Sequence, residues 1–280
     1  MSDRSKPPQA ILLPSVTVDH PPSMKAPIFI IGYPRSGTSF VGKLIATFTR
    51  LPSHGEAHTL TLLQEIHHQV NLYRRRTDFT GKELVKLLDL DELKDTNTRF
   101  FREFYRRTYG SDQFIDKTPG AVACHGWGVV KEVFPDAVFI ACVRSPVEVY
   151  ESAALKFGGR DGERPATDPV EVATGWVSAM RGIEQLLASP YAPDSHVVSQ
   201  LQLRSDPATT VTKLFSFLGL PDSVVDDGIA LCSQSREDVL TASIERPSYK
   251  TLRQASLPDA QAQQFREICA PVCEDWGIEL

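Results

Sequence analysis

The sharpest chemical pattern in the sequence is a glycine-framed loop at the end of a hydrophobic stretch. The apolar residues 28–31 end at Gly32, and Gly37 follows five residues later, directly before Thr38 and Ser39. The spacing G-x-x-x-x-G-x-[ST] is typical of loops that cradle phosphate groups. Backbone N–H groups and the helix dipole both attract an anion at the start of a helix. The loop therefore predicts a site for a phosphate-like group.

The charges near this loop argue against a nucleoside triphosphate bound through Mg²⁺. A nucleoside triphosphatase has a lysine directly after the second glycine, whereas this chain has Thr38 there and carries its positive charge earlier, as Arg35. The clearest predicted strand, residues 137–143, is followed by Arg144 instead of an acidic metal ligand. We expect a phosphate-like group that is bound without a metal ion.

A second anion site is predicted at Arg144. An arginine at the end of a buried strand is a good phosphate partner, because its guanidinium can form two charge-assisted hydrogen bonds. Ser152 follows eight residues later, about two helical turns away, and can share the same face. Arg35 and Arg144 at neighbouring strand ends suit a nucleotide that carries phosphates at both ends of its ribose.

The elements that must position these residues alternate along the chain. Strands are predicted at residues 28–31, 113–115, 137–143 and 196–200, with a further strand ending near Glu56. Helices are predicted at residues 38–49, 59–73, 82–93, 98–109, 122–134, 146–157, 168–187, 206–218 and 258–276. This order predicts an α/β fold with three α/β/α layers, a central parallel sheet and a P-loop-like strand-loop-helix. Ligands should bind at the carboxyl ends of the strands.

Composition and charge narrow the class of protein. The chain has 280 residues and a formal net charge of −5, which disfavours nucleic acid as a partner. No apolar run approaches the roughly 20 residues of a membrane-spanning helix. The five cysteines form no CxxC pair, so neither a zinc site nor a disulfide framework is indicated. Proline-rich residues 1–26 predict an extended arm before a single domain at residues 27–280, and the absence of a secretory pattern predicts a cytoplasmic protein.

Taken together, the motifs resemble the sulfotransferases that use 3′-phosphoadenosine 5′-phosphosulfate (PAPS), in particular their bacterial and Golgi-type branch. Residues 33–39 look like the 5′-phosphosulfate loop of that family, and residues 143–146 with Ser152 look like its 3′-phosphate site. Residues 116–119 resemble the segment whose lysine reaches the reacting sulfate. Residues 206–207 and 213–220 resemble a family stretch after the fourth strand. The resemblance covers about residues 27–221.

The resemblance implies which residues hold PAPS and, after transfer, the product adenosine 3′,5′-bisphosphate (PAP). Lys117 and Arg35 would stabilise the departing 5′-phosphate. Lys250, in a loosely matching segment at residues 248–250, would close over the nucleotide. The implied nucleotide-binding residues are Arg35, Ser36, Gly37, Thr38, Ser39, Arg144, Ser152 and Lys250.

The family also requires a general base for the acceptor hydroxyl. In its cytosolic branch a histidine lies two residues after the lysine, but this chain has Pro119 there. In the Golgi-type and several bacterial branches a glutamate follows the loop by about twenty residues, which corresponds to Glu56. Glu56 is followed by Ala57, where one branch has a second acid. His54 and His58 stay open as alternative bases, and a carboxylate that merely caps the next helix stays open too.

The predicted function is sulfuryl transfer by in-line displacement to a hydroxyl, with an amine less favoured, of a small-molecule or carrier-bound acceptor. The alternative is a P-loop kinase for small molecules or nucleotides, which would turn over ATP with Mg²⁺. A third interpretation is a regulator that binds PAP without transferring anything. Residues 200–203 replace the Tyr-Glu-Asp-Leu that the family often has, so the adenine contact stays open. The acceptor and the oligomeric state, including a homo-oligomer, also stay open, and residues 158–166 are a candidate lid.

Overall fold

The computed structural model describes residues 26–56, 58–75, 90–157, 167–240, 251–255 and 257–280. Lys250, the candidate lid at residues 158–166, most of the predicted helix at residues 82–93 and residues 1–25 of the predicted arm lie outside these ranges. Within the ranges, no helix has the length and apolar character needed to cross a membrane.

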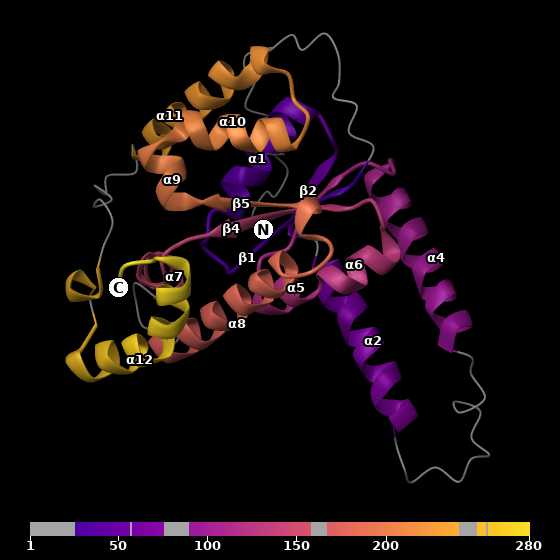
Figure 1. Cartoon of the computed structure of the whole chain (residues 1–280), viewed down its shortest axis with the longest axis horizontal. Helices are drawn as coiled ribbons and strands as arrows, with labels where there is room; N and C mark the ends of the chain where they lie inside the picture. The colour runs from indigo at the N-terminus through magenta and orange to yellow at the C-terminus, as the bar shows by residue number, and fades with distance from the viewer. Residues whose placement is uncertain (1–25, 57, 76–89, 158–166, 241–250, 256) are drawn as a thin grey trace, which may run out of the picture.

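The centre of the described chain is a parallel sheet of five strands (Figure 1). The strand order is β2-β3-β1-β4-β5, so β1 is central and pairs with β3 on one side and β4 on the other. This sheet confirms the predicted α/β fold. The strands are β1 (Ile28–Gly32), β2 (Ser53–Glu56), β3 (Ile115–Lys117), β4 (Val138–Val143) and β5 (Ser195–Ser199).

Helices cover both faces of the sheet and bury two separate hydrophobic clusters. One face is covered by α1 (Thr38–Thr49), α9 (Gln200–Ser205), α10 (Pro207–Phe217) and α11 (Val225–Leu240). The other cluster contains residues of α4 (Leu90–Tyr109), α5 (Ala121–His125), α6 (Trp127–Val133), α7 (Pro146–Phe157), α8 (Pro169–Leu187) and α12 (Asp259–Trp276). Figure 1 shows α2 (Thr59–Arg75) and α4 extending past the body of the sheet. Short 3-10 helices lie at Ala192–Asp194, Asp222–Val224 and Leu252–Gln254.

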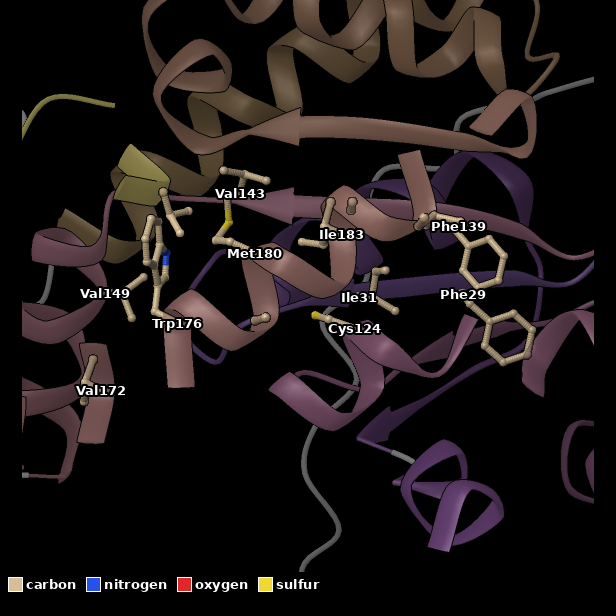
Figure 2. Packing of buried hydrophobic residues seen from close by; sticks show 14 of the residues in the cluster. Phe29, Ile31, Cys124, Phe139, Val143, Val149, Val172, Trp176, Met180 and Ile183 are labelled. Atoms are coloured by element: carbon tan, nitrogen blue, oxygen red, sulfur yellow. The ribbon is translucent and has the colours of Figure 1, made fainter. Parts of the chain in front are cut away.

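The two clusters explain why β1 is apolar at every position. Phe29 and Ile31 point into the cluster that contains α8, whereas Ile28 and Ile30 point into the cluster that contains α1. Successive strand residues face opposite sides, so a strand buried on both faces must be apolar throughout. In Figure 2, Trp176, Met180 and Ile183 of α8 lie in one packed cluster with Ile31 of β1 and Val143 of β4. Their spacing of four and three residues places them on one helix face.

Several element boundaries differ from those predicted. The single helix predicted at residues 122–134 is wrong: α5 and α6 are separate, because the chain turns at Gly126, whose N–H donates to the carbonyl of Ala123. Gln64 of α2 packs against this turn, where a Cβ at Gly126 would lie 2.9 Å from its Nε2. The strand predicted at residues 113–115 is instead Ile115–Lys117, so Asp116 and Lys117 belong to the strand itself. Helices α9 and α11 were not predicted.

The close packing of α8 against α5 gives a stability prediction. A Cβ at Gly182 would lie 2.7 Å from the backbone carbonyl of Cys124, so Gly182→Ala must push the two helices apart. Overpacking of this kind costs about 1–3 kcal/mol. In the control Gly128→Ala, in α6, a Cβ meets nothing within 4 Å, and alanine favours the helix. Urea denaturation should show a lower free energy of unfolding for Gly182→Ala only; equal stability of the two variants would contradict this packing.

Candidate active site

The carboxyl ends of the parallel strands bring the predicted site residues to one edge of the sheet. The chain runs from β1 to β2 and β3 on one side, then crosses to β4 and β5 on the other, so β1 and β4 flank a topological switch point. The prediction that Arg35 and Arg144 follow neighbouring strands is confirmed by the β1–β4 pairing. Across the edge, in the order of the strands, lie Glu56, Lys117, the loop after Gly32, Arg144 and Gln200.

The phosphate-type loop between β1 and α1 needs unusual backbone conformations. Gly37, directly before α1, has a φ of 89°, and Arg35 has a φ of 73°. Both φ values lie in the left-handed region, which is unfavourable for residues other than glycine. A Cβ at Gly37 would also lie 2.1 Å from Nε2 of the Gln200 side chain, so that side chain would have to move to admit it. No side chain caps the start of α1, which leaves the entry to the helix as a cradle for an anion.

Three of the predicted nucleotide-binding residues come together beside this loop. Arg35 Nε donates to Ser152 Oγ of α7 at 3.0 Å. Arg144 Nη1 donates to the backbone carbonyl of Arg35 at 2.9 Å. Arg35 is predicted to bind the 5′-phosphosulfate and Arg144 the 3′-phosphate, but the Arg35 guanidinium hydrogen-bonds to Ser152, the residue predicted to act with Arg144. The two cationic side chains therefore converge at the switch point.

Lys117 connects the loop with the candidate base. Its Nζ donates to Ser39 Oγ in the first turn of α1 at 2.9 Å and lies 3.5 Å from Glu56 Oε1. The Lys117 side chain is 13% exposed, whereas that of Glu56 is 46% exposed. The ammonium is thus held inside the site and the carboxylate faces outward, where an acceptor could approach it.

The two alternative bases differ in their surroundings. His58 Nε2 lies 3.6 Å from Glu56 Oε2, so this imidazole and the carboxylate share one location. His54 Nε2 instead lies 3.1 Å from the backbone carbonyl of Thr108 in α4, and the His54 ring packs on Tyr109 with 4.8 Å between centroids. His54 is therefore held against α4, whereas Glu56 lies next to Lys117 and His58 lies next to Glu56.

Comparison with known proteins explains this arrangement of residues. Residues 27–224 match the family model described as "Sulfotransferase family". This chain belongs to the sulfotransferase family. The match covers β1 to β5 and thus every strand end that contributes to the candidate site.

Solved sulfotransferases share the fold at low sequence identity. The sulfotransferase domain from the Synechococcus PCC 7002 olefin synthase has a TM-score of 0.52 and 18% identity, and covers 93% of this chain and 98% of that one. The sulfotransferase domain from the curacin biosynthetic pathway has a TM-score of 0.52 and 16% identity, and the match covers 91% of this chain and 98% of that one. Mouse SULT7A1 complexed with PAP has a TM-score of 0.50 and 13% identity, and the match covers 89% of this chain and 85% of that one. These likenesses show the fold alone.

A curated relative is much longer than this sulfotransferase. An "Uncharacterized protein" of Aquifex aeolicus (strain VF5) is 23% identical over 235 residues. The alignment covers 79% of this chain but only 29% of the relative, so this chain spans less than a third of that protein's length.

A buried carboxyl anchors the strand that carries Lys117 in this sulfotransferase. Asp116 is fully buried and accepts hydrogen bonds from Tyr105 Oη of α4 at 2.6 Å and from Thr118 Oγ1 at 2.8 Å. Burial raises the pKa of the Asp116 carboxyl, and the two hydrogen bonds partly oppose that rise. Because neighbouring strand residues face opposite sides, fixing Asp116 also fixes the direction of Lys117.

Two polar groups of the site lie in segments that the resemblance already marks, at residues 143–146 and 200–203, but no role was predicted for either side chain. Among the described residues, Ser145 Oγ and Gln200 Nε2 are buried and form no hydrogen bond. Ser145 follows Arg144, and Gln200 follows β5. A buried polar group without a partner costs about 1–3 kcal/mol, so both groups fit a site that receives a polar ligand. The available signal was their position at strand ends: Ser145 lies two residues after the strand predicted at residues 137–143, and Gln200 is the last residue of the strand predicted at residues 196–200.

The raised pKa of Asp116 predicts a pH dependence of stability. The folded protein holds this proton more tightly than the unfolded chain, so the stabilisation present below the ordinary pKa of about 4 is lost as pH rises through the folded pKa. Asp116→Asn keeps an acceptor for Tyr105 and removes this titration. Urea denaturation between about pH 4 and 8 should show the wild type losing stability relative to Asp116→Asn as pH rises.

The control is Asp206→Asn at the exposed cap of α10. Hydrogen bonds from Thr209 lower the pKa of Asp206, so its contribution to stability is lost as pH falls, which is the opposite sign. A wild type whose free energy of unfolding stays constant or increases with pH, relative to that of Asp116→Asn, would contradict the raised pKa of Asp116.

Proposed function

We propose that this sulfotransferase moves a sulfuryl group from PAPS to a hydroxyl of a small-molecule or carrier-bound acceptor. The observation that carries the proposal is the position of Lys117, whose ammonium contacts Ser39 of the loop and lies 3.5 Å from Glu56. A cation for the leaving group and a carboxylate for the acceptor proton are therefore side by side at the mouth of an anion-binding loop. In-line sulfuryl transfer needs a base on the acceptor side of the reacting sulfur and a cation on its leaving-group side.

The donor half of the site is supported by its chemistry. The loop residues Arg35, Ser36, Gly37, Thr38 and Ser39 would hold the 5′-phosphosulfate, and Arg144 with Ser152 would hold the 3′-phosphate. The unpartnered Ser145 Oγ and Gln200 Nε2 fit a polar nucleotide at the same edge. The structure of one protein of similar fold, mouse SULT7A1, is that of a complex with PAP, which is the product expected from PAPS. Lys250 keeps its proposed role but lies outside the described residues.

PAPS supplies the sulfuryl group: the acceptor oxygen forms a bond to sulfur while the bond from sulfur to the bridging oxygen of the 5′-phosphate breaks, which gives a sulfate ester and PAP. Glu56 accepts the proton of the acceptor O–H as general base. Lys117 and Arg35 neutralise the charge that grows on the departing 5′-phosphate. Ser39, bonded to the Lys117 ammonium at 2.9 Å, keeps that cation at the loop.

The first test of this proposal is nucleotide binding. Isothermal titration calorimetry should show PAP binding to the wild type, and Arg35→Ala and Arg144→Ala should each weaken it more than about tenfold, because hydrogen bonds to charged groups contribute roughly 1.5–3 kcal/mol. The control Arg181→Ala removes an arginine that pairs with Glu184 and Asp275, and it should leave the affinity unchanged. Binding of Mg²⁺–ATP in place of PAP would support the kinase alternative and overturn the proposal.

The second test concerns the base. Glu56→Gln should leave PAP affinity within about twofold of wild type and reduce turnover about 100-fold or more, because the acceptor proton has lost its carboxylate. Turnover is measured with labelled PAPS against a panel of alcohols, phenols, amines and sugars. Glu65→Gln, an exposed carboxylate on α2, is the matched control and should keep full activity. Full activity of Glu56→Gln together with an inactive His58→Gln would assign the base to His58.

A further inference from the structure

A single buried carboxylate joins two arginines at the edge of the candidate site. Glu148 of α7 is 6% exposed and accepts a hydrogen bond from Arg144 Nε at 2.9 Å through Oε2. Its other oxygen, Oε1, accepts from Arg204 Nη2 of α9 at 2.6 Å. One carboxylate thus pairs with two guanidiniums. Each oxygen holds one guanidinium, so the directions of both are fixed relative to α7.

The same face of α9 also meets the phosphate-type loop. Gln200 and Arg204 are four residues apart in this helix and therefore lie on one face. The Gln200 amide lies against Gly37, and its Nε2 is buried without a partner among the described residues. Buried donors are almost always hydrogen-bonded in folded proteins. An unpartnered donor on the face that carries Arg204 points to a ligand acceptor at this face, which is independent of the Glu148 contacts.

We propose that Arg204 contacts the 3′-phosphate together with Arg144, and that Glu148 is the positioning residue that holds both guanidiniums. The inference rests on the proposed function, because it concerns the nucleotide of that reaction. A phosphomonoester carries between one and two negative charges near neutral pH, so a second guanidinium beside Arg144 matches it. Arg204 and Glu148 thereby set a preference for a nucleotide that carries a 3′-phosphate over one that carries only a 5′-phosphate.

The test compares two probes, PAP and adenosine 5′-monophosphate, by calorimetry with the full chain. Arg204→Ala should weaken PAP binding about tenfold and leave the affinity for adenosine 5′-monophosphate within about twofold. Arg204→Lys should restore part of the loss. Glu148→Gln, which keeps the size of the side chain but replaces one acceptor oxygen with an NH2 group and removes the negative charge, should also lower the affinity for PAP relative to that for adenosine 5′-monophosphate.

The matched control is Glu184→Gln. Glu184 also accepts two hydrogen bonds, from Arg181 and Trp276, but it lies away from the nucleotide edge, so the ratio should stay at the wild-type value. The Arg204 side chain is 36% exposed, so Arg204→Ala keeps the test valid even if Glu148→Gln does not fold.

The outcomes separate this inference from the proposed function. If the wild type binds PAP and Arg204→Ala leaves the ratio of the affinities for PAP and adenosine 5′-monophosphate unchanged, the inference alone is overturned. Equal losses for both nucleotides in Arg204→Ala and Glu148→Gln would also overturn it, because they would indicate general damage and no selection of the 3′-phosphate. A wild type that binds neither nucleotide would overturn the proposed function, and this inference with it.

Discussion

The hydrogen bond from Arg144 to the backbone carbonyl of Arg35 is the contact on which the candidate site depends. It ties the end of β4 to the loop after β1, at the residue whose backbone is left-handed. Such a conformation costs about 1–3 kcal/mol in a residue other than glycine. A hydrogen bond from a charged donor contributes about 1.5–3 kcal/mol, which is enough to offset that cost. Trp176 of α8 is fully buried and donates a hydrogen bond to the carbonyl of Arg144 at 3.0 Å. The hydrophobic core therefore holds the backbone of Arg144, and the Arg144 side chain in turn holds the loop at Arg35.

The other half of the site is set by the alternation of β3. Asp116 and Lys117 are neighbours in sequence and face opposite sides of the strand. The side chain of Asp116 is buried in the core, where its carboxyl accepts hydrogen bonds from Tyr105 and Thr118. Lys117 is thereby directed at Ser39 and Glu56. A one-residue shift of β3 would exchange these two roles, so the register of a three-residue strand decides whether the site has its lysine.

The sequence was sufficient to predict elements whose signals are local. The helices at Thr38–Thr49 and Pro146–Phe157 have the predicted bounds, since one starts after Gly37 and the other starts with a proline. Strands β1 and β4 were visible as apolar runs. Helix α9 could not be predicted this way, because its six residues, QLQLRS, have no helical period and depend on a cap in which Ser199 Oγ accepts a hydrogen bond from the Gln202 N–H. The pairing of Arg204 with Glu148, 56 residues apart, exists only in three dimensions.

On the proposed function, the exposure of the strands separates the side that would hold the nucleotide from the side that would receive the acceptor. Strand β1 is buried at every residue, and Ser36 and Thr38 in the adjoining loop and helix are buried too, whereas β2 is exposed along its whole length. A buried loop can hold a nucleotide in fixed geometry, and an exposed edge strand leaves Glu56 open to acceptors of different size. Lys117 is the one described side chain that hydrogen-bonds to both the loop helix and Glu56. On the proposed mechanism this shared ammonium must serve the departing phosphate, so the donor and acceptor halves are coupled through a single cation.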